Sequence, residues 1–387
     1  MSTEIKKIYE EKKKRVMTTC NLEEPDYVPV LSQMNAMAIG YAGYTAREVL
    51  ADRDKEREAY KKALTDFYCD TVVGFGVNYP YDSFLDAGTQ TYLISENGYT
   101  FQHKESSSMT FEEYDEFFAD PIAFFANKIG YRKINGLQKP YPENYKTLEL
   151  LYGALDAHKK NSAYNKSEFV PNEVGVPLLA KNAAAHPLDN FFDFIRGFKN
   201  TLADIRRHPD LILRAIEVLT PYYKGTIPSK PVSEAFPYIR NTAHIPTFLS
   251  PKQFEKFYLP YVKWAVEQCH AMGTKYLFFC EGSWKNFFPF FEDLPKGSIV
   301  AALESDDVAE MKKEFGHFVT IAGGYTQSLL KYGTKQECID CAKRVIDACA
   351  PGGGYLFTGD KSFLTCEDIN VENYAAITEF AHEYGRY

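Results

Sequence analysis

The sequence has no surplus of positive charge and no long apolar run. Its 44 lysine and arginine residues are outnumbered by 52 acidic residues, which gives a net charge of −8. A nucleic-acid-binding protein needs a basic face that displaces counterions from phosphates, so we exclude that class. A membrane-spanning helix needs a run of roughly 18 or more apolar residues. The chain contains no such run, and we therefore expect no membrane span.

Segment 1–20 lacks the apolar core of a secretion signal, since it is charged and has the period of a helix. The eight cysteines of such a chain are expected to be reduced thiols in the cytoplasm. Cys338 and Cys341 form a CxxC motif inside a predicted helix, and we interpret both as structural residues. The chain is 15% aromatic. This content indicates a ring-rich core in the first place, and a ring-lined cavity as the alternative.

Short apolar runs alternate with amphipathic helices along the chain. Strands are predicted near 275–280, 298–303, 318–323 and 355–359 in the C-terminal half, and near 27–32, 70–76 and 176–180 in the N-terminal half. Two more, near 91–95 and 100–104, suggest a hairpin. Helices are expected near 143–160, 200–219, 250–272, 306–315, 334–349 and 368–384, and two of them open with the capping boxes Ser250–Gln253 and Thr334–Glu337. This alternation predicts parallel strands with helical crossovers, in one domain over residues 1–387.

Several C-terminal stretches resemble the uroporphyrinogen decarboxylase / corrinoid-dependent methyltransferase superfamily. They are RGFKNTLADIRRHPDLILRAIEVL, LSPKQFEKFYLPYV with LPKGSIVAALE, GGYTQSLLKYGTKQECIDCAKRVID, CAPGGGYLFTGD and VENYAAITEFAHEYGRY, within about residues 190–387. Residues 1–180 match only loosely. The resemblance implies an α/β fold, a (β/α)8 TIM barrel with N-terminal helical and hairpin additions.

The chemistry of such a barrel lies where its strands end. The ranges to examine are therefore Ser32–Asn35, Gly76–Tyr81, Lys181–His186, His244, Cys280–Ser283, Glu304–Asp307, Gly323–Gln327 and Gly359–Ser362.

The decarboxylase branch of this superfamily uses an arginine-rich N-terminal motif and an aspartate after an early strand. The segment after the first predicted strand is SQMNAMAIGYAGY, which has no arginine, and the strand near 70–76 leads to Asn78 without an aspartate. An acidic porphyrinogen would meet little positive charge there. We therefore favour the methyltransferase branch. The alternative is a uroporphyrinogen decarboxylase-like enzyme, or a decarboxylase of another small acid.

Zinc-dependent members of the methyltransferase branch use a His-x-Cys motif and a later cysteine. The first motif corresponds to Phe278-Phe279-Cys280, and the later cysteine corresponds to Asp360. Two hypotheses remain open. In one, Cys280 or Glu281 joins Asp360 and His244 as zinc ligands. In the other there is no metal, and the carboxylates act as general acid and substrate clamp.

The resemblance implies transfer of a methyl group from a small O-methylated donor to the Co(I) form of a cobalamin carried by a separate corrinoid protein. We favour an aryl methyl ether of the methoxyphenol type because of the aromatic content. A phenolate is a poor leaving group, so its oxygen needs a proton or a Lewis acid as it departs. Asp360 and Glu281 are the candidate acids, and the candidate substrate-binding residues are Asn78, Tyr79, Tyr81, Arg240, Phe278, Trp284 and Tyr325. Phe279 is a further aromatic residue near a predicted strand end that favours an aromatic donor.

The barrel mouth must face the corrinoid of the partner protein, so we expect an open mouth with the partner docked over the strand ends. The lack of a D-x-H-x-x-G cobalamin motif in this chain fits this expectation. A homodimer is a further option that the sequence leaves open.

Overall fold

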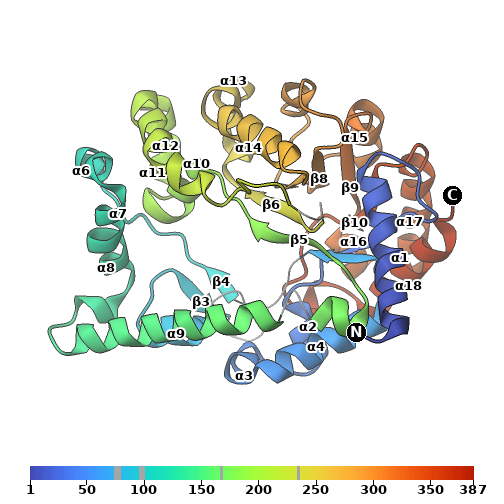
Figure 1. Cartoon of the computed structure of the whole chain (residues 1–387), viewed down its shortest axis with the longest axis horizontal. Helices are drawn as coiled ribbons and strands as arrows, with labels where there is room; N and C mark the ends of the chain where they lie inside the picture. The colour runs from blue at the N-terminus through green and yellow to red at the C-terminus, as the bar shows by residue number, and fades with distance from the viewer. Residues whose placement is uncertain (74–79, 96–100, 166–168, 233–235) are drawn as a thin grey trace.

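Eight parallel strands form one sheet in the order β1-β2-β5-β6-β7-β8-β9-β10 (Figure 1). The computed structural model describes residues 1–73, 80–95, 101–165, 169–232 and 236–387. The strands are β1 (Leu31–Ser32), β2 (Thr71–Val73), β5 (Leu178–Ala183), β6 (Tyr238–Ala243), β7 (Tyr276–Cys280), β8 (Ile299–Leu303), β9 (Val319–Tyr325) and β10 (Tyr355–Gly359).

The two ends of the sheet meet. The backbone N–H of Phe357 donates to the carbonyl of Pro29, and the Thr358 hydroxyl donates to the carbonyl of Leu31. β1 therefore lies beside β10 and closes the sheet into a barrel. The predicted TIM barrel is confirmed.

Helices cover the outside of the barrel and pack on its outward-facing side chains. They include α4 (Arg53–Asp66), α10 (Pro187–Asn190), α11 (Phe198–Arg207), α12 (Pro209–Lys224), α14 (Leu259–Ala271), α15 (Val308–Phe315), α16 (Gln327–Tyr332), α17 (Lys335–Cys349) and α18 (Val371–Tyr384). Both predicted capping boxes are present. None of the helices that the structure describes has the length and apolar character of a membrane span.

Two sequence predictions need correction. The single helix expected near 200–219 is two helices, α11 and α12, because Pro209 disfavours a helical conformation at His208 and starts a new helix. No range was predicted for strand β6, although His244 was included among the strand ends. The β6 sequence YIRNTA has polar residues at three consecutive positions, so it does not show the apolar run of a buried strand.

The N-terminal helix α1 (Thr3–Cys20) closes the barrel at the amino ends of its strands. Val16 and Cys20 pack against the inward side chains of the barrel, and the Thr320 hydroxyl donates to the carbonyl of Cys20. Arg15 ties α1 to the barrel through ion pairs with Asp26 (2.7 Å) and Asp70 (2.5 Å). The opposite end of the barrel is left for the site.

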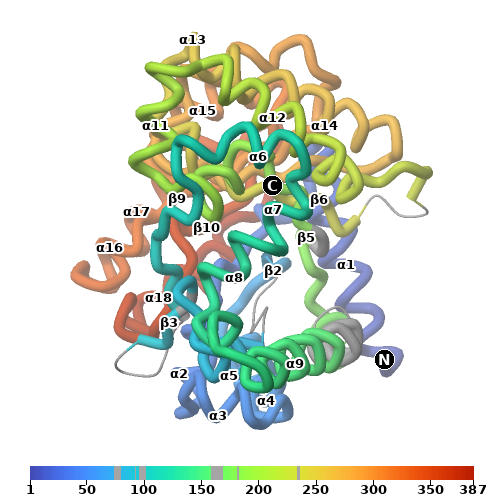
Figure 2. The backbone as a smooth tube through the Cα atoms, turned by 90° about the vertical axis from the view of Figure 1, so that its left-hand side faces the viewer, coloured from blue at the N-terminus to red at the C-terminus, as the bar shows by residue number. Residues whose placement is uncertain are grey.

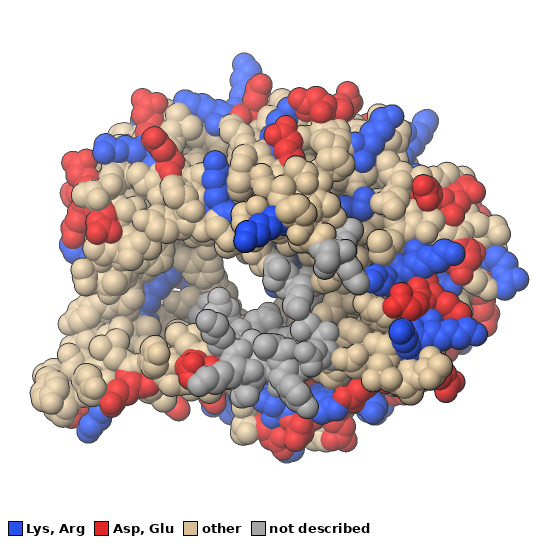
Figure 3. All heavy atoms as spheres, in the orientation of Figure 1, with Lys and Arg blue, Asp and Glu red and all other residues tan. Residues whose placement is uncertain are grey.

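The predicted N-terminal additions are present. They comprise α2 (Met37–Tyr41), α3 (Ala46–Ala51), α5 (Tyr81–Asp86), the antiparallel hairpin β3 (Tyr92–Ile94) and β4 (Phe101–His103), α6 (Tyr114–Ala119), α7 (Pro121–Phe124), α8 (Gly130–Lys133) and α9 (Glu143–Asn165). Figures 1 and 2 place α6–α9 together on one side of the barrel, the side toward which the β5 arrow points. Figure 3 shows a hollow between the barrel helices and α9.

Candidate active site

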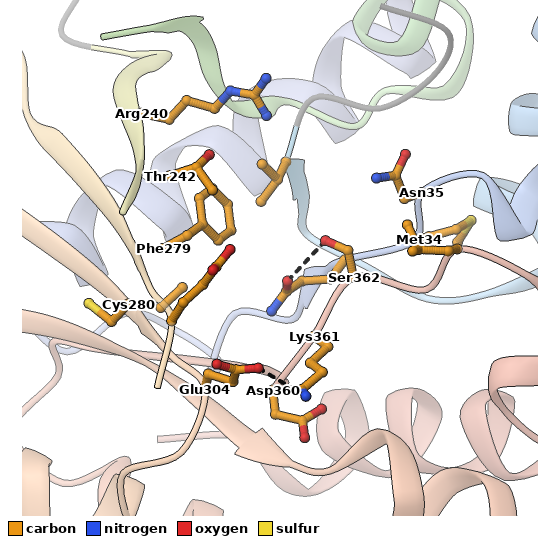
Figure 4. Close-up of a pocket in the computed structure, with 15 residues that line it drawn as sticks. Met34, Asn35, Arg240, Thr242, Phe279, Cys280, Glu304, Asp360, Lys361 and Ser362 are labelled. Carbon is orange, nitrogen blue, oxygen red and sulfur yellow. Dashed lines mark hydrogen bonds and ion pairs between the residues drawn. The ribbon is translucent and has the colours of Figure 1, made fainter. Parts of the chain in front are cut away.

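A cavity of about 400 Å³ lies at the carboxyl ends of the strands (Figure 4). This volume is typical of a site for a small molecule. Its walls come mainly from the strand-end ranges that the sequence analysis singled out. The lining residues are Gln33, Met34, Asn35, Val73, Arg240, Thr242, Phe279, Cys280, Glu281, Ala302, Glu304, Asp360, Lys361, Ser362 and Leu364.

Strand geometry decides which side chains reach this cavity. Successive residues of a strand point to opposite faces, so alternate residues of each barrel strand face the interior. Thr242 of β6 is in register with Phe279 of β7, which is in register with Ala302 of β8. These three residues all line the cavity, and Arg240 lies two positions before Thr242 on the same face.

Glu281 follows β7 directly and lies at the edge of the cavity. The chain then turns at Gly282, which has φ +69°, and a Cβ atom there would lie 1.8 Å from the Thr247 hydroxyl oxygen. Only glycine fits this position. The turn lets the Gly282 N–H donate to Glu304 Oε2 (2.5 Å), so it joins the ends of β7 and β8. Burial raises the pKa of Glu281 above its usual value.

Asp360 follows β10 and lies in the same cavity. Its Oδ1 atom accepts the backbone N–H of Gln327 (2.9 Å), the first residue of α16. Burial nonetheless raises the pKa of Asp360. The neighbouring Lys361 ammonium pairs with Glu304 (2.9 Å). Burial tends to raise the pKa of Glu304, but the Gly282 N–H and Lys361 outweigh it and lower that pKa. Two carboxyl groups whose pKa is raised by burial therefore lie beside one whose pKa is lowered.

His244 follows β6 and connects Glu281 to a residue that sequence analysis missed. Its Nδ1 atom lies 2.8 Å from Asp193 Oδ2, and its Nε2 atom lies 3.3 Å from Glu281 Oε1. Burial opposes the charge on His244, but Asp193 and Glu281 raise its pKa to about 9. Asp193 and His244 are 51 residues apart in a chain with no motif that links them, so no sequence signal pointed to this pair.

A buried aspartate fixes the backbone beneath His244. Asp189 Oδ1 accepts the N–H groups of His244 (3.1 Å) and Ile245 (2.9 Å), and its Oδ2 atom accepts the Tyr258 hydroxyl (2.7 Å). Burial raises the pKa of Asp189 to about 7. Asn241 completes this network by donating to the Tyr258 hydroxyl.

Three aromatic residues that were expected to contact substrate lie in the core. Phe278, Trp284 and Tyr325 are 1%, 0% and 2% exposed. Phe278 follows Leu277 and precedes Phe279, both inward-facing, so it points outward to the helices, where it packs against Trp284. Tyr325 packs against Phe357. The prediction that these three line the cavity is wrong, whereas Phe279 does line it.

The remaining predicted substrate contacts lie elsewhere. Tyr81 begins α5 and packs near the small apolar cluster around Ile39 and Val49, outside the cavity walls. Asn78 and Tyr79 lie outside the described residues.

The predicted zinc ligands do not form a ligand set. Cys280 is buried in the outer core with Phe278, and Figure 4 shows its sulfur on the side away from Asp360. Both ring nitrogens of His244 already face carboxylates. Nowhere in residues 1–73, 80–95, 101–165, 169–232 and 236–387 do three or more His, Cys, Asp or Glu side chains gather with the spacing of a metal site. Cys280, Asp360 and His244 therefore do not fit zinc.

The fold and the cavity define a (β/α)8-barrel protein with a small-molecule site at the carboxyl ends of its strands. The chain belongs to the uroporphyrinogen decarboxylase (URO-D) family, whose model matches residues 122–384. The search of curated proteins finds no match. A solved structure of a methyltransferase from Methanosarcina mazei is similar, with a TM-score of 0.60 over 96% of this chain and 98% of that chain. The two sequences are 11% identical, so the likeness shows the shared fold.

Proposed function

We propose that this protein is a methyltransferase that moves a methyl group from a small O-methylated donor to the Co(I) corrinoid of a partner protein. One observation carries the proposal. Glu281 and Asp360, two carboxyl groups whose pKa is raised by burial, line one small cavity at the carboxyl end of the barrel. The methyltransferase from Methanosarcina mazei, which has the same fold, supports the same class of reaction.

The proposed reaction breaks the bond between the methyl carbon and the ether oxygen. The corrinoid supplies the nucleophile, whose electron pair forms the new bond to the methyl group. The ether oxygen keeps the electron pair of the broken bond and needs a proton, because a phenolate is a poor leaving group. Glu281 or Asp360 donates that proton, and a positioned general acid contributes about 10²–10⁴ in rate.

The other residues of the cavity have supporting roles in this proposal. Phe279, Val73 and Met34 offer an apolar wall for an aromatic donor. Lys361 lowers the pKa of Glu304 and balances its negative charge, so Glu304 does not compete for the proton. The corrinoid protein would dock over the cavity mouth. Eight free thiols are consistent with the reducing cytoplasm as the location.

The test mixes the purified protein with a reduced corrinoid protein and a panel of methoxylated arenes. We expect loss of the Co(I) absorbance with at least one donor, together with release of the matching phenol. Glu281→Gln should suppress this change. If no donor changes the Co(I) spectrum and the protein instead releases CO₂ from a small acid tested beside the panel, the decarboxylase alternative is correct.

A further inference from the structure

Arg240 is a cation on the cavity wall for which the described residues provide no counterion. It comes from the middle of β6 and points into the cavity, on the side opposite to Glu304 and Asp360 (Figure 4). Within the part of the chain that the structure describes, no side chain or carbonyl forms an ion pair or hydrogen bond with its guanidinium group. Burial lowers the pKa of Arg240, and no carboxylate of the described residues offsets this cost.

The two most buried arginines of the chain behave differently. Arg15 pairs with Asp26 and Asp70, and Arg196 pairs with Asp204 (2.8 Å). A buried charge is normally matched by an opposite charge, since removing it from water is costly. Lys361, the other cation of the cavity, is also matched, by Glu304. Arg240 thus keeps a planar set of donors that a ligand can use.

The cavity has a positive end and an acidic end. In Figure 4, Arg240 stands at one end, and Glu304, Asp360 and Lys361 stand at the other. Glu281, the ring of Phe279 and the side chains of Val73 and Ala302 are also in the wall. A carboxylate would form a bidentate pair with the unpaired guanidinium of Arg240, whereas Lys361 at the opposite end is already paired with Glu304. The two ends therefore impose one orientation on a molecule with an anionic group and an apolar body.

We infer that the methyl donor carries a carboxylate, which Arg240 binds, so that the ether oxygen at the far side of the ring faces Glu281 and Asp360. The donor class is then a methoxylated aromatic acid rather than a neutral methoxyphenol. This inference rests on the proposed function for the identity of the reacting group. The anion site itself rests on Arg240 alone.

The test measures binding by calorimetry without any corrinoid protein. The ligands are para-methoxybenzoate, its uncharged amide and methoxybenzene, with wild type, Arg240→Gln, Arg240→Lys and the exposed control Arg207→Gln at the end of α11. We expect wild type and Arg207→Gln to bind the acid roughly 10- to 100-fold more tightly than the amide, as for loss of a charged hydrogen-bond partner. Arg240→Gln should remove that preference, and Arg240→Lys should retain part of it.

Two results would overturn the inference. One is equal or weaker binding of the acid relative to the amide by wild type, a comparison that needs no variant and so does not depend on how a variant folds. The other is an unchanged preference in folded Arg240→Gln. Methyl transfer to reduced corrinoid is then measured separately. If the acid binds through Arg240 but no methyl group is transferred, the proposed function is wrong and the anion site stands. Transfer in a protein that shows no preference for the acid in the binding test removes the anion site and leaves the proposed function.

Discussion

The imidazole ring of His244 bridges two carboxylates, with Nε2 3.3 Å from Glu281 Oε1 and Nδ1 2.8 Å from Asp193 Oδ2. Because the pKa of His244 is raised to about 9, the ring is positively charged at neutral pH. It is the cation in contact with the carboxyl group that we propose as a proton donor. Glu304 and Asp193 also raise the pKa of Glu281, and Lys361 lowers it.

Replacement of His244 by glutamine should change the pH dependence of methyl transfer. Burial raises the pKa of Glu281 and His244 lowers it, so the variant should have a still higher Glu281 pKa. Glu281 donates a proton only while it is protonated, and the rate falls as the pH rises through its pKa. The falling limb of the pH profile should therefore move to higher pH. Single-turnover rates across the neutral and alkaline range measure this shift.

Asp193→Asn provides a comparison, because Asp193 raises the pKa of both His244 and Glu281. Its loss weakens the positive charge on His244, which raises the Glu281 pKa, and removes a direct effect that also raises it, so the two changes oppose each other and its profile should shift less than that of His244→Gln. A shift of the His244→Gln profile to lower pH would contradict the assignment of Glu281 as the acid.

Glu281→Gln and Asp360→Asn should separate the two candidate acids. Loss of the true general acid lowers the rate by about 10²–10⁴. Asp360 also accepts the N–H of Gln327, and asparagine keeps an oxygen for that bond, so its melting temperature should stay near that of wild type. Asp360→Ala should lose about 1 kcal/mol of stability, because the N–H of Gln327 loses its acceptor.

Glu314→Gln on the exposed surface of α15 is the control for the loss of a carboxylate. Rates of wild-type magnitude in both Glu281→Gln and Asp360→Asn would exclude carboxylic acid catalysis in this cavity.

The sequence was informative about where the chain turns and where strands end. Capping boxes such as Thr334–Glu337 act through contacts within one helical turn, so they appear as a short sequence motif. A strand of the barrel buries both faces, so it appears as a short apolar run. The strand-end ranges accordingly contained Gln33, Glu304 and Lys361 before their contacts were known.

What the sequence could not supply is the direction of each side chain. Phe278 and Phe279 are chemically identical, and a change of one residue in register exchanges the buried ring for the one in the cavity. Cys280 was misassigned for the same reason. The Asp193–His244 pair is formed by separate segments of the barrel rim, and only the folded chain brings the two residues together.

Replacement of Cys280 by alanine tests the outward direction of its thiol. The side chain packs in the core with Phe278 and Leu303, so we expect a loss of about 1 kcal/mol in the free energy of unfolding and a near-normal rate of transfer. Metal analysis by mass spectrometry should give the same zinc content for wild type and Cys280→Ala. Stoichiometric zinc in wild type that disappears in this variant, with loss of transfer, would restore the zinc hypothesis.

Asp189→Asn should make stability less dependent on pH. Burial raises the pKa of Asp189 in the folded chain to about 7, whereas an unfolded aspartate has a pKa near 3.9. The stability that this group contributes is therefore fully present below about pH 4 and is lost as the pH rises through about 7. Asparagine cannot ionise, and its oxygen can still accept the N–H groups of His244 and Ile245. Relative to wild type, the free energy of unfolding of the variant should increase by about 1–3 kcal/mol between these two pH values.

Urea unfolding at a series of pH values measures the difference, with the exposed Asp210→Asn as control. Parallel stability curves for Asp189→Asn and wild type would mean that Asp189 is ionised throughout, held in that state by its three hydrogen bonds.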